Sequence, residues 1–214
     1  LAAEPGQRVL EIGCGWGGFA EMATHDGLAV TGLTLSPAQL AWARQRVPSA
    51  DLRLQDYRDT TERFDHVVSI EMFEAVGERW WPTYFRTVAN ALKPEGRAVI
   101  QSITIRDDLF ATYRRGTDFI QQYIFPGGML PSRAEFRAQA ARQGLVVRDE
   151  YAFGVDYART LALWRDAFDA KWPQIAALGF DEPFRRLWRL YLSYCEAGFL
   201  AGNIDVVQFE LARA

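Results

Sequence analysis

The sequence predicts an α/β protein built on a seven-stranded, mostly parallel sheet. Three observations support this prediction. Segments with the pattern of buried strands alternate with helical segments along the chain. A glycine-rich turn within Val9–Gly18 (VLEIGCGWGG) joins the first strand to the first helix. Two connections are unusually long, one between the fifth strand and its helix and one between the last two strands, which is typical of inserted structure.

The elements are expected in regular succession. Strands are predicted at Arg8–Gly13, Leu28–Thr34, Asp51–Gln55, Asp65–Ile70, Arg97–Ile105, Leu145–Phe153 and Asp205–Ala212. Helices are predicted at Gly17–His25, Pro37–Arg46, Trp81–Leu92 and Arg133–Gln143. Ser36 followed by Pro37 is a typical helix start, and the segment Lys93–Gly96 (KPEG) is a strong helix breaker.

We expect residues 1–214 to form a single domain with two insertions, 105–132 and 154–204. The second insertion contains two helical patterns, Tyr157–Lys171 and Phe184–Leu200, which are crowded with Trp, Tyr, Phe and Leu. The chain starts at Leu1, close to the first strand, so a segment preceding it is expected to be absent.

Composition excludes several classes of protein. The net charge of −3 argues against a general nucleic-acid binder, and no run of 18 apolar residues is present. Cys14 and Cys195 belong to no C-x-x-C pair, and we expect free thiols in a reducing cytoplasm. The only histidines, His25 and His66, lie on different elements, so no metal site is predicted.

The glycine turn indicates a nucleotide-like cofactor. Gly13, Gly15 and Gly18 follow the G-x-G-x-x-G pattern, which lets a ligand approach the backbone closely. A dinucleotide site needs an acid at the end of the second strand, but Thr34 stands there, whereas Glu11 precedes the glycines. This arrangement resembles the S-adenosylmethionine (SAM) site of class I methyltransferases. An NAD(P) site and a turn with no ligand are the alternatives.

Several segments together resemble the cyclopropane-fatty-acyl-phospholipid synthase family, which includes the mycolic acid cyclopropane synthases. They are Leu10–Gly18, Gly32–Gln39, Leu54–Asp59, Ser69–Gly77 (SIEMFEAVG), Asp118–Ser132 (DFIQQYIFPGGMLPS), Asp156–Trp164 and Tyr191–Phe199. The resemblance implies a class I methyltransferase with a Rossmann-like sheet and a helical acyl-pocket insertion between the last two strands.

The resemblance also implies a reaction. In this family a cis double bond of an unsaturated acyl chain takes a methylene group from SAM, and a bound bicarbonate ion deprotonates the carbocation. A related lipid C-methyltransferase that yields methyl-branched chains is one alternative. A protein that binds SAM or lipid without catalysis is another.

The residues expected at the site form three sets. The predicted cofactor residues are Glu11, Gly13, Cys14, Gly15, Trp16, Gly17, Thr34, Gln39, Gln55, Asp56 and Tyr57. Aromatic faces stabilise a cation without capturing it, which favours Phe73, Phe125, Tyr191 and Phe199 as the lining of the acyl pocket. The resemblance adds Leu130 and Cys195 to this pocket. The resemblance gives the bicarbonate ligands as Glu74, Tyr157, Gln101 and the backbone of Ile103.

Each assignment has a plainer alternative. Any one aromatic, including Trp16, could be ordinary core, and Gln39 or Tyr57 could be a solvated surface residue. Glu74 could be a helix cap or surface acid, although a carboxylate in the apolar run MFEAV is costly without a partner.

The chain departs from the family pattern at three positions. Gln101 replaces a histidine, Ala75 stands where His is common, and Glu71 replaces a small residue and could narrow or charge the pocket mouth. We expect a cytoplasmic protein in transient peripheral contact with a membrane. The sequence does not decide between a monomer and a homodimer. Candidate headgroup contacts are Arg114, Arg115, Arg185, Arg186 and Arg189, which could also be solvated charges.

Overall fold

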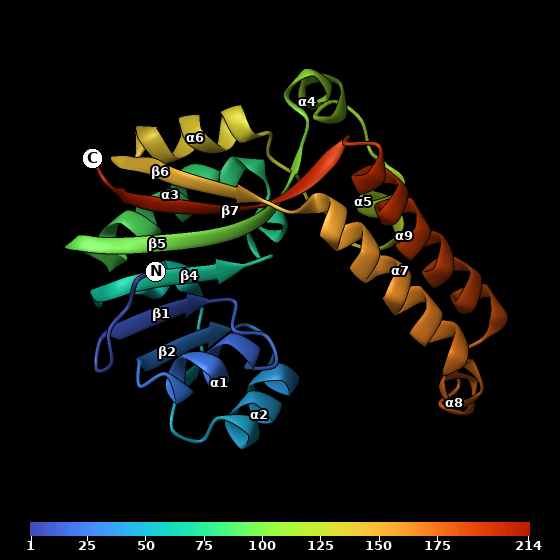
Figure 1. Cartoon of the computed structure of the whole chain (residues 1–214), viewed down its shortest axis with the longest axis horizontal. Helices are drawn as coiled ribbons and strands as arrows, with labels where there is room; N and C mark the ends of the chain where they lie inside the picture. The colour runs from blue at the N-terminus through green and yellow to red at the C-terminus, as the bar shows by residue number, and fades with distance from the viewer. The chain divides into compact units, whose positions relative to one another are not determined.

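Seven strands form one sheet in the order β3-β2-β1-β4-β5-β7-β6 in the computed structural model, which describes all 214 residues (Figure 1). The strands are β1 (Arg8–Ile12), β2 (Ala29–Thr34), β3 (Asp51–Leu54), β4 (Phe64–Ile70), β5 (Leu92–Ile105), β6 (Leu145–Ala152) and β7 (Ile204–Arg213). Four neighbouring pairs, β1–β2, β1–β4, β2–β3 and β4–β5, are parallel. The predicted seven-stranded, mostly parallel α/β fold is therefore confirmed.

The prediction was wrong about where β5 begins. The KPEG segment does not separate helix from strand, because β5 already starts at Leu92. The register passes from Phe64↔Leu92 to His66↔Arg97, so the extra residues are accommodated as a bulge. Gly96 permits this, because a Cβ there would lie 2.7 Å from the carbonyl oxygen of Asp65.

The chain divides into two compact units, which are described separately below. The first comprises Leu1–Ser102, Ala134–Tyr151 and Gln208–Ala214, and the second comprises Ile103–Arg133 and Ala152–Val207. The two predicted insertions, 105–132 and 154–204, lie entirely within the second unit.

The helices of the first unit are α1 (Gly18–His25), α2 (Pro37–Arg46), α3 (Trp81–Ala91) and α6 (Arg133–Arg142), whose first residue belongs to the second unit. Short 3-10 turns occur at Tyr57–Asp59, Phe73–Ala75 and Glu78–Trp80. The start of α2 is as expected, since the Ser36 side chain accepts a hydrogen bond from the Gln39 amide and Pro37 fills the first turn.

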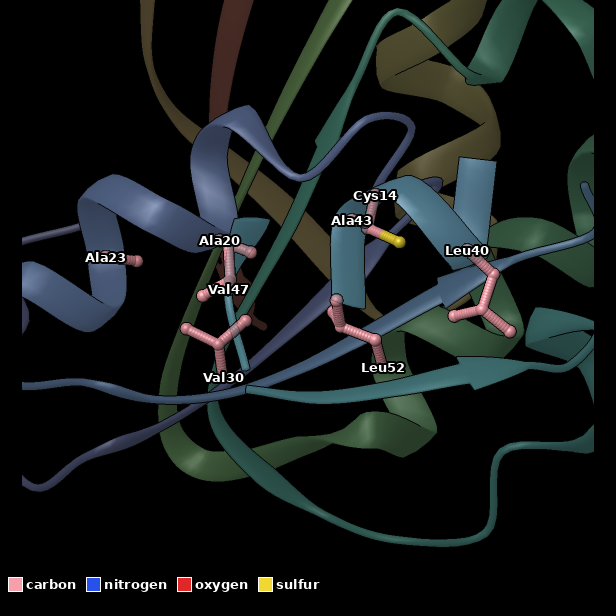
Figure 2. Close-up of a cluster of buried hydrophobic side chains, with 8 residues drawn as sticks. All are labelled: Cys14, Ala20, Ala23, Val30, Leu40, Ala43, Val47 and Leu52. Atoms are coloured by element: carbon pink, nitrogen blue, oxygen red, sulfur yellow. The ribbon is translucent and has the colours of Figure 1, made fainter. Parts of the chain in front are cut away.

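One apolar cluster holds α1 and α2 against β2 and β3 (Figure 2). Its buried side chains are Cys14, Ala20, Ala23, Val30, Leu40, Ala43, Val47 and Leu52. The small residues allow close approach: a Cβ at Gly32 of β2 would lie 2.7 Å from Leu52 and 3.0 Å from Cys14. This cluster fixes the glycine turn to the second strand.

A second core of the first unit is aromatic. Phe73 is fully buried, with ring centroids at 4.9–5.4 Å from those of Trp81, Tyr84, Phe85 and Phe136. Phe136 of α6 stacks on Phe209 of β7 at 3.9 Å. Because Phe73 follows β4 in the sequence, this core fixes the segment after that strand.

The second unit is helical. It contains α4 (Asp107–Tyr113), α5 (Phe119–Tyr123), α7 (Gly154–Ala170), α8 (Trp172–Ala177) and α9 (Glu182–Leu200). Helices α7 and α9 run side by side and α8 lies at the turn between them (Figure 1). α7 and α9 begin two to three residues before their predicted starts, and α4, α5 and α8 were not predicted. None of the helices has the length and apolar run that crossing a membrane requires.

Truncation of Phe136 tests the aromatic core. We expect Phe136→Ala to lower the free energy of unfolding by about 3–5 kcal/mol, because a fully buried ring between Phe73 and Phe209 is replaced by a cavity. Urea denaturation followed by circular dichroism measures this change. The control is Met22→Ala, since Met22 is 69% exposed and should cost less than about 0.5 kcal/mol. Equal effects of the two substitutions would contradict the assignment.

Candidate functional site

A pocket of about 740 Å³ opens at the carboxyl ends of β1, β2 and β4 in the first unit. Ile12, Thr34 and Ile70 end these strands and line it. Such an edge is where open α/β sheets bind ligands. The other lining residues are Gly13, Gly15, Leu33, Leu35, Ser36, Gln39, Gln55, Asp56, Tyr57, Arg58, Glu71, Met72, Ala75, Val76 and Trp80.

The glycine turn forms one wall of this pocket. The amides of Gly13 and Cys14 both donate to the carbonyl oxygen of Leu33, at 3.0 and 2.8 Å. Gly13 has a φ of +84°, and a Cβ there would lie 2.8 Å from Cγ of Met72. Both the backbone conformation and the space therefore require glycine at this position.

Glu11 is a buried carboxylic acid immediately before the turn. It accepts a hydrogen bond from the Ala20 amide in α1, while its Oε2 is buried without a hydrogen-bond partner. Burial raises the pKa of Glu11 to about 8, against the lowering effect of that hydrogen bond. A buried carboxyl oxygen without a partner, beside a backbone open to close approach, fits a ligand that carries an amine.

The wall after β2 is polar and uncharged. The Thr34 hydroxyl donates to Oε1 of Gln39 at 3.1 Å and accepts from the Ser36 amide at 3.1 Å. The amide of Gln55 donates to the Thr34 carbonyl at 3.1 Å, so this loop is tied to the next strand. Hydroxyl and amide groups in this position suit a sugar without requiring an acid.

Planar groups line the adjoining wall. Tyr57 lies edge-on to Tyr84 at 5.6 Å, and burial raises the pKa of its hydroxyl. The Arg58 guanidinium lies 5.4 Å from the Trp80 ring and pairs with Asp56 at 2.6 Å, which lowers the pKa of that acid. Flat apolar faces beside hydrogen-bonding groups suit a heteroaromatic base.

The structure separates the predicted cofactor residues into two groups. Those that line the pocket are Gly13, Gly15, Thr34, Gln39, Gln55, Asp56 and Tyr57. Glu11 and Cys14 are buried, Gly17 caps α1, and Trp16 is 53% exposed and packs edge-on against Trp42 at 6.2 Å. The sequence reasoning missed Arg58, Met72 and Trp80. Arg58 and Met72 lie within the segments Leu54–Asp59 and Ser69–Gly77, which could have indicated them. Trp80 lies outside those segments, and its cation–π contact with Arg58 is not apparent from the sequence.

The predicted bicarbonate ligands are divided between the units. Glu74, in the 3-10 turn after β4, and Gln101 of β5 belong to the first unit, and Ile103 and Tyr157 belong to the second. Gln101 donates through Nε2 to Oε1 of Glu71 at 2.7 Å and accepts from Nε2 of Gln208 at 3.0 Å. Its side-chain amide is therefore oriented from both sides.

Glu71 has an unusual backbone. Its φ is +51°, a left-handed conformation that costs a non-glycine residue about 1–2 kcal/mol. The Glu71 amide donates to the Gln101 carbonyl at 2.9 Å, and the side chains of the same two residues are joined as well. These two hydrogen bonds hold the strained conformation.

The predicted acyl-pocket residues of the second unit gather around α7 and α9. Tyr157 and Phe199 lie 5.1 Å apart, and Phe125 lies edge-on to Tyr191 at 6.1 Å. Tyr191 and Cys195 pack against the buried cluster that contains Phe199. Burial raises the pKa of the Cys195 thiol to about 12, so it is an unreactive apolar group. Leu130 follows α5, and its amide donates to the Tyr113 hydroxyl at 3.3 Å.

Phe73 is placed differently from the other members of that set. It has no exposed surface and forms part of the aromatic core of the first unit. Its predicted contact with an acyl chain stays a prediction, as do those of Phe125, Leu130, Tyr191, Cys195 and Phe199.

Comparison with known proteins gives a consistent set of relatives. The sequence profile of the mycolic acid cyclopropane synthetase family matches residues 1–209. The tuberculostearic acid methyltransferase of Mycobacterium tuberculosis is 43% identical, over 98% of this chain and 51% of that protein. The cyclopropane-fatty-acyl-phospholipid synthase of Escherichia coli is 40% identical, over 100% of this chain and 55% of that protein. This chain thus spans about half the length of these two relatives.

Solved structures agree. The cyclopropane synthase MmaA2 of Mycobacterium tuberculosis superimposes with a TM-score of 0.91 at 29% identity, over 100% of this chain and 80% of that chain. The mycolic acid cyclopropane synthase CmaA1, solved with S-adenosylhomocysteine (SAH) and CTAB, gives a TM-score of 0.89 at 30% identity, over 99% of this chain and 79% of that chain.

The pKa of Glu11 predicts a pH dependence of stability. The folded-state pKa of about 8 exceeds the unfolded value of 4.5, so in this window the unfolded chain has released a proton that the folded protein keeps. This contribution to stability is complete below pH 4.5 and is lost as the pH rises to about 8. We expect Glu11→Gln to remove a slope of up to about 1.4 kcal/mol per pH unit.

Urea denaturation of both proteins across this pH range measures the slope. The exposed Glu95 provides the control, because Glu95→Gln should leave the slope of the parent chain in place. Parallel stability curves for the parent chain and Glu11→Gln would show that Glu11 ionises normally.

Proposed function

Because the chain belongs to the mycolic acid cyclopropane synthetase family, we propose that it transfers a one-carbon unit from SAM to a cis double bond of an unsaturated acyl chain. The observation that carries this proposal is the pocket at the ends of β1, β2 and β4, with its glycine turn and its uncharged wall after β2. Family relatives over the whole chain support the choice of SAM, and one of them was solved with SAH.

The pocket residues would hold SAM by its separate parts. The backbone of Gly13 and Gly15 would accommodate the amino-acid end. Glu11, buried behind the turn, would accept a hydrogen bond from the ammonium through water. Thr34 and Gln39 would contact the ribose, and Tyr57 the adenine. When bound, SAM supplies an electrophilic methyl group on a cationic sulfur.

The acyl chain would be received by the aromatic cluster of the second unit. The alkene electron pair forms the new carbon–carbon bond to the methyl group, and the sulfur keeps the electrons of the bond that breaks. This leaves a carbocation on the acyl chain. Faces of Phe125, Tyr191 and Phe199 would stabilise it without offering a lone pair for capture.

Loss of a proton from the transferred carbon, with the C–H electrons closing the ring, gives the cyclopropane. We propose that Glu74, Tyr157, Gln101 and the backbone of Ile103 hold a bicarbonate ion as the base. Gln101 supports this in one respect, because its Nε2 keeps a second hydrogen after donating to Glu71.

A methyl-branched product is the second candidate. Proton loss from a neighbouring carbon of the acyl chain instead re-forms a double bond and leaves the transferred methyl group as a branch. The observation that favours it is that a relative 43% identical to this chain is named a tuberculostearic acid methyltransferase. Gln101 stands where the family has a histidine and cannot take up a proton as histidine does, so removal of the proton can differ in this chain.

Product analysis distinguishes these functions. The protein is incubated with SAM and vesicles of an unsaturated phospholipid, and the lipids are examined by mass spectrometry and proton NMR. We expect a gain of one CH₂ unit with high-field cyclopropane resonances. A methyl-branched alkene has the same mass but lacks those resonances. Absence of any modified lipid would favour a protein that only binds SAM or lipid.

Glu74→Gln should lower turnover by roughly 10²–10⁴-fold, because the base would lose its anchoring carboxylate, while the affinity for SAM stays unchanged. Glu95→Gln, a change of the same kind at an exposed acid, should leave turnover intact. Full turnover by Glu74→Gln would remove Glu74 from the mechanism.

We also propose that the protein meets its lipid at a bilayer surface through the turn around α8. Leu178 is 78% exposed and Phe180 is 45% exposed, and both follow this short helix. Arg185 and Arg189 pair with Asp169 at 3.6 and 3.3 Å, whereas Arg186 approaches Glu182 at 3.7 Å and is 80% exposed. Apolar insertion therefore accounts better for a contact here than headgroup binding by these arginines.

Vesicle co-sedimentation tests this contact. We expect the double variant Leu178→Glu, Phe180→Glu to lose most of its binding to phosphatidylcholine vesicles, because two exposed apolar groups become charged. Met22→Glu, at an exposed apolar position in the first unit, should bind as the parent chain does. Binding only to phosphatidylglycerol vesicles, abolished by salt, would point to the arginines instead.

A further inference from the structure

Two consecutive tryptophans at the start of α3 have opposite surroundings. Trp81 is fully buried, and its ring stacks on that of Phe73 with the centroids 5.4 Å apart. Trp80 is 38% exposed and lines the pocket. Because Trp81 anchors this point of the chain in the aromatic core, the backbone that carries Trp80 is fixed at the pocket wall.

The ring of Trp80 is held by two cations. The guanidinium of Arg79 lies 4.8 Å from the centroid of this ring, and that of Arg58 lies 5.4 Å from it. Arg58 is itself fixed, because the Asp56 carboxylate accepts hydrogen bonds from its backbone amide at 2.9 Å, from Nε at 3.0 Å and from Nη2 at 2.6 Å. Since a cation attracts the face of an aromatic ring, these contacts keep the indole in the wall.

The pocket has only two aromatic rings, those of Tyr57 and Trp80. They belong to the same part of the wall, because Tyr57 precedes Arg58 in the chain and Arg58 contacts Trp80. A planar heteroaromatic base binds aromatic side chains through its π face more strongly than it binds hydroxyl or aliphatic groups. The base of a ligand in this pocket is therefore favoured at the wall that contains Trp80.

We propose that Trp80 is a binding residue for the adenine base of the cofactor, and that Arg58 and Arg79 are positioning residues for its indole. This inference rests on the proposed SAM site. In that site the amino-acid end lies at the glycine turn, on another wall of the pocket. The contribution of Trp80 is then the same for every ligand that carries adenine, with or without an amino-acid end.

Isothermal titration calorimetry tests the proposal without turnover. The ligands are SAH and 5′-methylthioadenosine, which keeps the adenine and the ribose but lacks the amino-acid end. We expect Trp80→Ala to raise the Kd of both ligands by the same factor, about 5- to 100-fold, because an aromatic contact with the base is lost. Trp80→Phe keeps a ring and should recover most of the affinity.

Trp42→Ala is the matched control. It removes an indole that is 58% exposed and lies outside the pocket lining, so both values of Kd should stay unchanged. Arg79→Met leaves the indole but removes one of its two cations, and should raise both values by less than Trp80→Ala does.

Tryptophan fluorescence provides a readout that a purely structural role of Trp80 would not change. The chain has seven tryptophans, so the signal of Trp80 is the difference between the parent chain and Trp80→Phe. We expect SAH to quench the emission of the parent chain and of Trp42→Phe, and to leave that of Trp80→Phe unchanged.

Three results would overturn the proposal. They are an unchanged Kd of both ligands in Trp80→Ala, an effect of that substitution on SAH alone, and a quench by SAH that persists undiminished in Trp80→Phe. Failure of the parent chain to bind either ligand would instead overturn the SAM site itself.

Discussion

The attachment of the glycine turn to the second strand is the contact on which the rest of the pocket depends. Two consecutive amides, those of Gly13 and Cys14, donate to one carbonyl, that of Leu33. Cys14 then packs beneath the turn with α1, α2 and β3. Because these contacts fix the turn, the ends of β1 and β2 and the segment after β4 can border one cavity. A turn held less firmly would leave Glu11 open to water.

Most of the sheet could be predicted because the signals that mark its strands and turns lie within short stretches of sequence. The first four strands and α1 and α2 lie within one residue of their expected bounds, since apolar runs, Ser36–Pro37 and the glycines each act over a few residues. The KPEG segment misled for the same reason. Its local preference ends a helix, but pairing with β4 draws it into a bulged strand, and that pairing is invisible in the segment itself.

The candidate site was predictable only where a motif marked it. The turn, Thr34, Gln39 and the segment Gln55–Tyr57 came from motif and resemblance, and these residues line the pocket. Phe73 shows the limit, since the sequence around it does not reveal that its side chain is fully buried in the aromatic core. Trp80 lies outside these segments, and Arg58 lies within Leu54–Asp59 without having been assigned a role. Both line the wall through a cation–π contact between residues far apart in sequence.

The position of Gln208 has a consequence for synthesis of the chain. This residue orients Gln101 and lies on β7, which follows the other six strands of the sheet in the sequence. All residues that line the pocket lie between Ile12 and Trp80, so a nascent chain emerging from the ribosome can assemble the wall early. Its acidic residue Glu71, however, is not fully held in place until the final strand is translated. Ligand affinity should therefore mature late, after the sheet has already begun to form.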